Sequence, residues 1–316
     1  MSSVKTLAKP QTNLSLAKPF LKWVGGKSQL REQFLSLYPS QLETGKIKKY
    51  FELFTGGGAI FFEVIQRFEL DQIFLNDLNQ DLILAYKVIQ DHPWELIAKL
   101  IPLKEKLVQL DLEQRAELFY QIRGNYNQQR INFDYQKLSV EAIQRVAWLI
   151  FINKTCFNGL YRTNKKGDFN APFGRYKNPK ICDQDNILKV SELLQGVTLV
   201  SGDYQSLDQF IDHHSFVYID PPYRPITKTA NFTAYAKSRF NDANQVELSD
   251  YYTHLSENVG AKVMLSNSNP HNSDPVDDFF HDLYCNYKIN EVYATRMINS
   301  DATKRGKITE LVITNY

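Results

Sequence analysis

Short apolar runs alternate with amphipathic segments near the start and near the end of the chain. The runs are four to seven residues long, which suits strands that are buried on both faces of a sheet. They lie at residues 50–54, 72–76, 197–200, 216–219, 262–265 and 308–314. Helical periodicity follows at residues 59–68, 79–90 and about 243–258. Strand followed by helix, repeated along the chain, predicts an α/β fold with a parallel sheet.

The middle of the chain has a different pattern. Residues 94–108, 114–128 and 141–151 read as successive helices with no strand between them. Residues 154–178 are rich in Asn, Lys, Gly and Tyr, which indicates an extended loop or hairpin that carries function. We therefore expect a mobile polar N-terminus at 1–17, a catalytic α/β domain at 18–91 and 179–316, and an inserted, mainly helical domain at 92–178.

The composition is that of an ordinary globular protein. Of the 316 residues, 43% are hydrophobic and 23% are charged, and no apolar run approaches the length that spans a bilayer. The N-terminal segment lacks the apolar core of a secretory signal. The three cysteines (Cys156, Cys182 and Cys285) form no CxxC pair, so the sequence predicts neither a zinc site nor a disulfide framework. A reducing, intracellular setting fits these features best.

The charge is unevenly distributed. The net charge of +2 is not that of a strongly basic nucleic-acid binder. Residues 154–180, however, carry seven Lys or Arg residues against one acid, Asp168. A local basic stretch of this kind is either a solvated loop or an electrostatic footprint for a polyanion.

A glycine turn follows the first predicted strand. Residues 51–58 read FELFTGGG, and the glycines let a ligand approach the backbone closely at a strand-to-helix turn. The next strand ends in Asn76-Asp77-Leu78-Asn79, which places Asp77 about 20 residues after the glycines, where an acid can bind ribose hydroxyls. These two features predict a nucleoside-containing ligand and leave NAD and S-adenosylmethionine open.

A second glycine motif, Gly25-Gly26-Lys27-Ser28, resembles the end of a P-loop. A P-loop also needs a glycine five residues before Gly26, where this chain has Leu21, and a strand directly before the motif. The pattern therefore does not favour an ATPase.

The most informative motif is Asp220-Pro221-Pro222-Tyr223, which directly follows the apolar run at 216–219. A strand cannot continue through two prolines, because both lack the N–H, so Asp220 lies at the end of the strand and faces the ligand crevice. Its carboxylate and a freed backbone carbonyl can accept two N–H bonds from an exocyclic amine and stabilise the positive charge that develops when the amine attacks a methyl donor. Tyr223 offers a flat face to a base.

This chemistry narrows the reaction class. The exocyclic amine of adenine or cytosine fits, whereas methylation at cytosine C5 needs a cysteine nucleophile in a strand-end loop, and none of the three cysteines has that position. A base in a duplex must be extruded before it can react, at a cost of a few kcal/mol. The methyl donor carries its own leaving group, so no metal is required.

Together these motifs resemble the Dam-type (DpnM-like, D12 class) DNA adenine-N6 methyltransferases, which act at GATC. The resemblance rests on residues 20–27, 52–58, 76–79 and 220–223, and the segment 229–235 (TANFTAY) is also similar to the loop after the catalytic motif. The order of these motifs, with the recognition region before Asp220, is that of the α group. One departure is Leu53, where many members have Pro, and we still expect the turn to form.

The resemblance implies a Rossmann-like, S-adenosylmethionine-dependent methyltransferase sheet with a helical target-recognition domain and hairpin. The catalytic residues would be Asp220, Pro221, Pro222 and Tyr223. The residues that would contact S-adenosylmethionine are Trp23, Lys27, Phe54, Gly56, Gly58, Asp77, Asp203, Tyr204 and Asp220. No metal is implied.

The resemblance also implies how residues 154–178 would read DNA. Those facing the base pairs would be Lys22, Asn158, Leu160, Arg162, Pro172 and Tyr176. Phe157 would wedge into the base stack, and Asn164, Asn170 and Arg175 would hold phosphates. Arg at a guanine edge is a common specific contact, and Leu160 offers an apolar surface to a thymine methyl group.

Two alternatives remain open from the residues alone: a cytosine-N4 methyltransferase, and a catalytically idle DNA-binding regulator on the same scaffold. We expect a cytoplasmic, bacterial or phage-encoded monomer that acts on chromosomal double-stranded DNA. A cognate restriction endonuclease acting on the same site is a further candidate partner.

Overall fold

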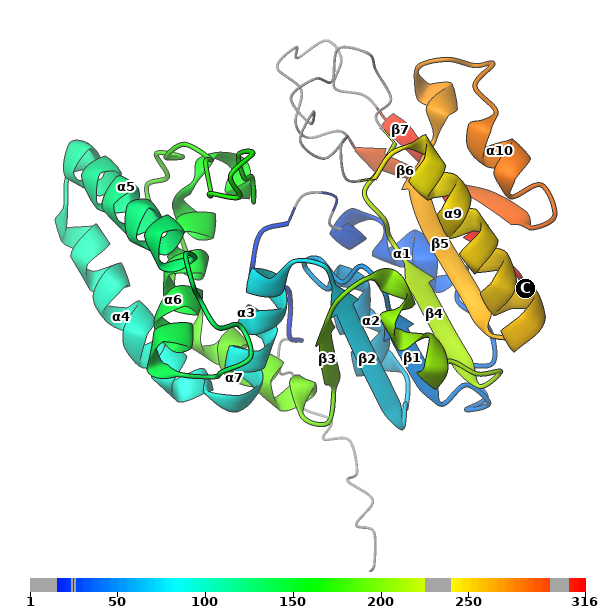
Figure 1. Ribbon diagram of the computed structural model, residues 1–316, viewed down its shortest axis with the longest axis horizontal. Helices are drawn as coiled ribbons and strands as arrows, with labels where there is room; N and C mark the ends of the chain where they lie inside the picture. Colours follow the sequence, from blue (N-terminus) through cyan, green and yellow to red (C-terminus); the bar gives the residue numbers. More distant parts are fainter. Residues whose placement is uncertain (1–15, 24, 26, 225–239, 296–306) are drawn as a thin grey trace, which may run out of the picture.

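A seven-stranded mixed sheet forms the centre of the protein (Figure 1). The computed structural model describes residues 16–23, 25, 27–224, 240–295 and 307–316. The expected mobile N-terminus, apart from its last two residues, and the 229–235 segment therefore lie outside the described residues. Ala17 is described and is buried, with its backbone bonded to the Gln66 side chain.

The strand order is β3-β2-β1-β4-β5-β7-β6. The strands are β1 (Lys49–Glu52), β2 (Gln72–Asp77), β3 (Thr198–Ser201), β4 (Ser215–Ile219), β5 (Lys262–Ser268), β6 (Lys288–Thr295) and β7 (Lys307–Thr314). β1 to β5 are parallel, and β7 runs antiparallel between β5 and β6. The predicted α/β fold is confirmed, and all six predicted strands are present. β6 was not predicted, because its sequence (KINEVYAT) has neither a continuous apolar run nor a regular alternation, and it lies at the edge of the sheet.

Helices cover both faces of the sheet, so the central strands are mostly buried. Every residue of β4 is buried. One face packs against α2 (Ala59–Arg67) and α3 (Gln80–Asp91), and the other packs against α9 (Asp242–Thr253) and α10 (Phe279–Leu283). Other helical elements of the α/β part are η1 (Lys27–Gln29), α1 (Arg31–Leu35), α7 (Gln184–Leu194), η3 (Tyr204–Phe210), η5 (His254–Val259) and η6 (Pro270–Asn272).

Three helices stand to one side of the sheet, between α3 and α7 in the sequence (Figure 1). They are α4 (Pro93–Gln109), α5 (Leu112–Gln129) and α6 (Val140–Thr155), at the places where the sequence predicted successive helices. Their apolar side chains, such as Phe119 and Phe151, belong to the same hydrophobic cluster as Phe61 of α2. The helical part is therefore packed on the α/β part through a continuous core.

A buried ion pair also joins the two parts. Arg145 of α6 is fully buried, and its Nε and Nη2 donate to the two carboxylate oxygens of Asp81 in α3 at 2.6 and 3.0 Å. Its Nη1 donates to the carbonyl of Tyr126 in α5 at 2.8 Å. Because each charge is met by hydrogen bonds, this bidentate pair fixes the angle between α3, α5 and α6.

The segment after α6 folds back on itself. It begins with η2 (Phe157–Gly159), and antiparallel bridges join Cys156 to Phe173 and Thr163 to Phe169. The turn at its tip is closed by Asn164, whose Oδ1 accepts from the backbone N–H of Lys166 and Asp168. The segment is thus an irregular hairpin, as the sequence predicted. Among the described residues, no helix is both long and apolar enough to cross a membrane.

Candidate active site

The glycine turn and Asp77 lie at the carboxyl ends of neighbouring strands. The backbone N–H groups of Gly56 and Asn79 donate to the two carboxylate oxygens of Asp77, each at 2.9 Å. Burial raises the pKa of Asp77, and these two hydrogen bonds oppose that shift. Gly56 has a φ of 48°, and a Cβ there would lie 2.9 Å from Cδ1 of Trp23. The turn therefore requires glycine on both conformational and steric grounds.

Trp23 links this turn to the hairpin. Its side chain lies against Gly56 and Gly57, and its ring stacks on Tyr161 with centroids 5.2 Å apart. The Tyr161 hydroxyl donates to Oδ2 of Asp81 at 3.4 Å. One aromatic pair thus connects the N-terminal motif at residues 20–27, the glycine turn at 56–58 and the hairpin.

Asp220 stands at the end of β4, as the sequence predicted, and both of its carboxylate oxygens are engaged. Ser266 Oγ donates to Oδ1 at 2.9 Å, and Lys27 Nζ lies 2.8 Å from Oδ2. Lys27 is almost fully buried, and its Nζ also donates to the Gly25 carbonyl at 2.8 Å. Lys27 of the N-terminal motif at residues 20–27 and Asp220 of the Asp-Pro-Pro-Tyr motif therefore form one ion pair.

Tyr223 is held beside this pair. Its hydroxyl donates to Oε2 of Glu310 at 2.7 Å, and Lys27 Nζ lies 4.6 Å from its ring centroid. Pro221 is buried, and the carbonyl of Pro222 accepts from Gln245 Nε2 at 3.1 Å. The turn is therefore supported by α9 and β7 as well as by its own prolines.

Four carboxyl groups, of which Glu52 is buried, lie near these strand ends, where the sequence predicts a ligand crevice: Glu52, Asp77, Asp220 and Glu310. Burial raises the pKa of Glu52 to about 8, although a hydrogen bond from the Tyr50 hydroxyl lowers it, and Asp220 and Asp77 raise it further. Burial also raises the pKa of Glu310. Burial thus makes these groups resist ionisation, and Glu52, with a pKa of about 8, keeps its proton at neutral pH.

The end of β3 closes the other side of the glycine turn. Tyr204 stacks on Phe54 with ring centroids 5.6 Å apart, and Asp203 Oδ1 accepts from the N–H of Gln205. The buried Asn76 side chain donates to the carbonyls of Leu53, Gly202 and Asp203, while its own Oδ1 has no partner. Asn76 therefore ties three strand ends together, a role that the sequence did not reveal.

The hairpin residues fall into two groups. Phe157, Pro172 and Arg175 are exposed, with 51% of Phe157 accessible. The remaining positions (Asn158, Leu160, Arg162, Asn164, Asn170 and Tyr176) are half-buried. Phe157 and Arg175 thus lie at the surface of the hairpin.

Several of the half-buried side chains bond one another. Arg162 donates to the Oδ1 and carbonyl of Asn170 at 2.7 and 3.0 Å. The N–H of Asn158 donates to the Tyr176 hydroxyl at 3.0 Å, and Lys22 Nζ lies 4.2 Å from the Tyr176 ring centroid. The structure thus brings Lys22 to the base of the hairpin.

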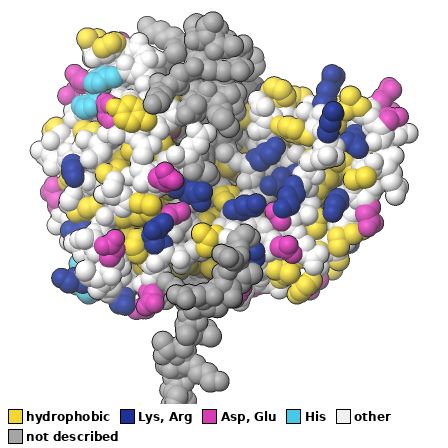
Figure 2. Space-filling view, turned by 180° about the vertical axis from the view of Figure 1, so that it is seen from behind, with side chains coloured by type: hydrophobic (Ala, Val, Ile, Leu, Met, Phe, Trp, Pro, Cys, Tyr) yellow, Lys and Arg dark blue, Asp and Glu magenta, His cyan; other side chains and the backbone are white. Residues whose placement is uncertain are grey.

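Positive charge gathers on one face of the molecule. Figure 2 shows Lys and Arg side chains over the helical part and its junction with the sheet. Burial lowers the pKa of Lys154 to about 8, and the nearby Lys22, Lys18 and Lys180 lower it further. A cavity of about 210 Å³ is lined in part by Lys18, Lys154 and Lys180. The Lys and Arg side chains over the helical part suit a polyanion.

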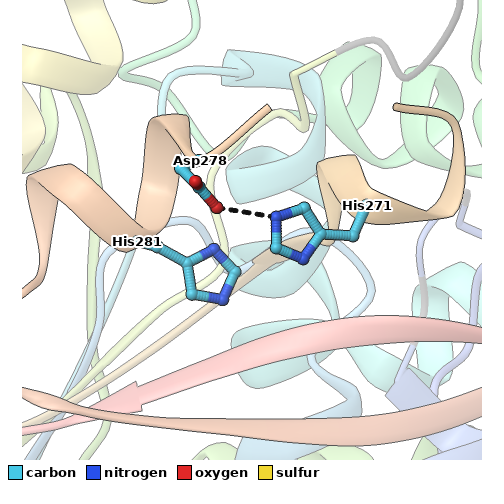
Figure 3. Close-up of side chains that lie close together, drawn as sticks. All are labelled: His271, Asp278 and His281. Carbon is cyan, nitrogen blue, oxygen red and sulfur yellow. Dashed lines mark hydrogen bonds and ion pairs between the residues drawn. The ribbon is translucent and has the colours of Figure 1, made fainter. Parts of the chain in front are cut away.

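A separate His/Asp group lies outside the strand-end site. His271, Asp278 and His281 place one ligand atom each within 4.8 Å of one another (Figure 3). The two imidazole rings are stacked, however, with planes 7° apart and centroids 4.6 Å apart. Because an imidazole lone pair lies in the plane of its ring, one ion cannot align with both rings in this arrangement. His271 Nε2 is hydrogen bonded to Asp278 Oδ1 at 2.8 Å, which joins η6 to α10.

The sheet order and the motifs at its strand ends together define a Rossmann-like methyltransferase. The model of the D12 class N6 adenine-specific DNA methyltransferases matches residues 23–298. The chain therefore belongs to this family.

Curated relatives agree with this assignment. "Type II methyltransferase M.MjaIII" of Methanocaldococcus jannaschii is 46% identical over 300 residues, 95% of this chain and 99% of the relative. "Type II methyltransferase M1.LlaDCHI" of Lactococcus lactis subsp. cremoris is 36% identical over 308 residues, 97% and 98% of the two chains. A "DNA adenine methylase" of Vibrio cholerae is 30% identical over 295 residues, 93% and 95% of the two chains. The expected enzyme class is confirmed, with DNA as the substrate.

Proposed function

We propose that this chain transfers the methyl group of S-adenosylmethionine to the N6 amino group of an adenine that is flipped out of duplex DNA, within GATC. The observation that carries the choice of methyl donor is membership of a methyltransferase family, together with Asp77 and Asp220 at the ends of their strands. S-adenosylmethionine has a sulfonium and an ammonium group, and carboxylates can pair with such cations. NAD, which the sequence left open, has no methyl group to transfer.

The residues around the crevice fit this ligand. Asp77 is positioned at the end of β2 for ribose hydroxyls, next to the glycine turn. Phe54 and Tyr204 form an aromatic pair beside Asp203 that suits an adenine ring. The further residues proposed to hold the ligand are Trp23, Lys27, Gly56, Gly58 and Asp220. When bound, S-adenosylmethionine supplies a methyl group on a positively charged sulfur.

Asp220 acts on the target amine. An adenine N6 nitrogen is a poor nucleophile because its lone pair is delocalised into the ring. The Asp220 carboxylate and the Pro221 carbonyl accept its two N–H bonds, which favours a pyramidal nitrogen and stabilises its developing positive charge. Pro222 stiffens the turn, and Tyr223 stacks on the extruded base.

The hairpin selects the DNA sequence that is methylated. Lys22, Asn158, Leu160, Arg162, Pro172 and Tyr176 face the base pairs, and Asn164, Asn170 and Arg175 hold phosphates. Phe157 inserts into the stack of DNA bases. Its exposed ring allows this insertion. Residues 92–178 thus act as the target-recognition domain, and residues 18–91 and 179–316 as the catalytic domain. This order of motifs corresponds to the α group.

Two of the relatives are named Type II methyltransferases. On that ground we propose that the chain protects DNA from an endonuclease that cuts the same site. We also propose that it works as a monomer in the cytoplasm.

Asp220→Ala tests the catalytic assignment. We expect loss of methyl transfer with DNA binding largely retained, because the carboxylate acts on the amine and not on the phosphate backbone. Tritium transfer from labelled S-adenosylmethionine measures the first, and gel-shift titration the second. Asp212→Ala is the matched control, because it removes a carboxylate paired with Lys49 before the opposite end of β4. Turnover by Asp220→Ala would refute the mechanism.

The site assignment has its own test. Plasmid DNA treated with the enzyme is digested with GATC-cleaving nucleases that differ in their sensitivity to adenine methylation, and the modified base is mapped. Methyl groups on adenines outside GATC would refute the site, while leaving the reaction intact.

A further inference from the structure

The catalytic turn is held by two strands that contribute nothing to its sequence motif. Ile219 of β4 pairs with Leu265 of β5, so the next residue, Ser266, lies level with Asp220 and bonds it. β7 pairs with β5 on the other side, with Glu310 opposite Ser268. This pairing places Glu310 of β7 beside the catalytic turn. Glu310 lies beyond residues 23–298, which the family model matches.

Glu310 faces two members of the site at once. Its Oε2 accepts from the Tyr223 hydroxyl at 2.7 Å and lies 3.8 Å from Lys27 Nζ. Its side chain is 16% exposed, compared with 21% for Asp220. Burial raises the pKa of Glu310, while Lys27 and Tyr223 oppose the shift. A carboxyl group kept in this surrounding costs desolvation energy, which its two partners offset.

The Tyr223 ring depends on contacts beyond its own turn for its orientation. It lies at the end of a proline-stiffened backbone, but the prolines fix the main chain and leave the side-chain torsions free. The hydrogen bond to Glu310 anchors the far end of the ring. A ring that must present one flat face to a base needs such an anchor.

Lys27 needs a partner when the target amine binds Asp220. In this structure both Asp220 oxygens are engaged, one by Ser266 and one by Lys27. A target amine that bonds Asp220 must share or displace the lysine. Glu310 lies close enough to keep the buried ammonium paired when that happens.

We propose that Glu310 is a positioning residue for methyl transfer, which fixes the Tyr223 ring through its hydroxyl and gives Lys27 a second carboxylate. This inference rests on the proposed roles of Asp220 and Tyr223.

Tyr223→Phe is the decisive variant, because it keeps the ring and removes only the hydroxyl that Glu310 holds. We expect its single-turnover rate to fall on the order of 10- to 100-fold, as for other small misplacements of a reacting geometry. The KM values for DNA and methyl donor should change little, since neither ligand loses its main contacts. Transfer at the wild-type rate would overturn the proposal.

Glu310→Ala and the double variant complete a cycle. Glu310→Ala should slow transfer by a similar factor, and Tyr223→Phe/Glu310→Ala should be no more than about threefold slower than the slower single variant, because both remove one interaction. Independent, multiplying losses would overturn the proposal. Glu310→Gln, whose amide oxygen can still accept from Tyr223, should recover part of the rate.

The matched control is Glu63→Gln, a carboxyl of α2 that is 11% exposed and paired with Arg67, away from the turn. It should transfer methyl groups at the wild-type rate. Asp220→Ala in the same assay separates the two hypotheses. If Asp220→Ala retains turnover, the proposed mechanism fails. If it is inactive while Tyr223→Phe and Glu310→Ala are fully active, only the role of Glu310 fails.

Discussion

Arg162 and Arg175 have the same charge but different surroundings in the hairpin. Arg162 is half-buried and its guanidinium is oriented by two bonds to Asn170, whereas Arg175 is exposed. A guanidinium with a fixed plane suits the bidentate reading of a guanine edge, and an exposed one suits a phosphate.

Arg162→Ala should therefore weaken discrimination at one base pair by ~1–3 kcal/mol, the range for a lost bidentate contact. Transfer rates on GATC and on each singly substituted site measure this. Arg175→Ala serves as the comparison: it should weaken binding to all sequences alike and reduce the slope of affinity against salt by about one. An equal loss on every sequence from Arg162→Ala would assign it to the phosphates instead.

Some residues of the site could be predicted from the sequence alone, and others could not. Asp220 and Asp77 were predictable, because each directly follows an apolar run that must be a strand. Glu310 lies within such a run, at residues 308–314, and an acid inside a buried strand was the signal that could have identified it. Ser266 carried no signal, because a serine in a strand has many ordinary uses.

At the scale of elements, α3 connects the ligand crevice with the helical part. Asn79 caps its first turn by accepting from the N–H groups of Asp81 and Leu82. Two positions later, Asp81 receives Arg145 together with the hydroxyls of Tyr135 and Tyr161. The N-terminal turn of this helix is therefore shared by the crevice, the helical part and the hairpin.

Asp81→Asn should destabilise the protein by about 3–5 kcal/mol, because it leaves the buried Arg145 without its counter-charge. Urea unfolding followed by circular dichroism measures the change. Asp91→Asn, at the exposed end of the same helix, is the control and should cost less than about 0.5 kcal/mol. Similar small losses in both variants would show that the ion pair does not hold α3 to α6.

The elements themselves were largely predictable. Helices α4, α5 and α6 lie where their periodicity placed them, because each has an apolar stripe that packs on its neighbours. The edge strand β6 was not predicted, since its sequence has no regular pattern and only its pairing with β7 makes it a strand.

At the scale of the whole molecule, the small net charge of +2 conceals a separation of charge. Four carboxyl groups lie near the strand ends of the site, and Lys and Arg side chains lie over the helical part and its junction with the sheet (Figure 2). The interior acids have a consequence for stability, because a buried carboxyl group resists ionisation in the folded state but ionises freely in the unfolded state.

Glu52 should therefore make the protein less stable as pH rises. Its pKa is about 8 in the folded state, compared with 4.5 for an exposed Glu. Between these values the folded state holds a proton that the unfolded state has lost, so stability falls as pH increases from about 4.5 to 8 and then levels off. The contribution is on the order of a few kcal/mol.

Thermal unfolding from pH 5 to pH 8 tests this expectation. Glu52→Gln keeps an acceptor for the Tyr50 hydroxyl and removes the titrating group, so its Tm should fall less steeply over that interval than the wild-type Tm. The difference between the two slopes is the quantity to measure, since other acids titrate in both proteins. Parallel slopes would show that Glu52 does not carry this effect.

The sequence by itself determined the parallel sheet, the helical insertion and the motifs that lie at the strand ends. These follow from local patterns: apolar periodicity, glycine turns and prolines that end a strand act within a few residues of one another. Only the tertiary structure decided which side chains hold those motifs in place. Tyr223 bonds Glu310, 87 residues away, and Asp220 bonds Ser266, 46 residues away. Such partners have no fixed spacing in the chain, because the sheet register and the packing of its layers bring them together.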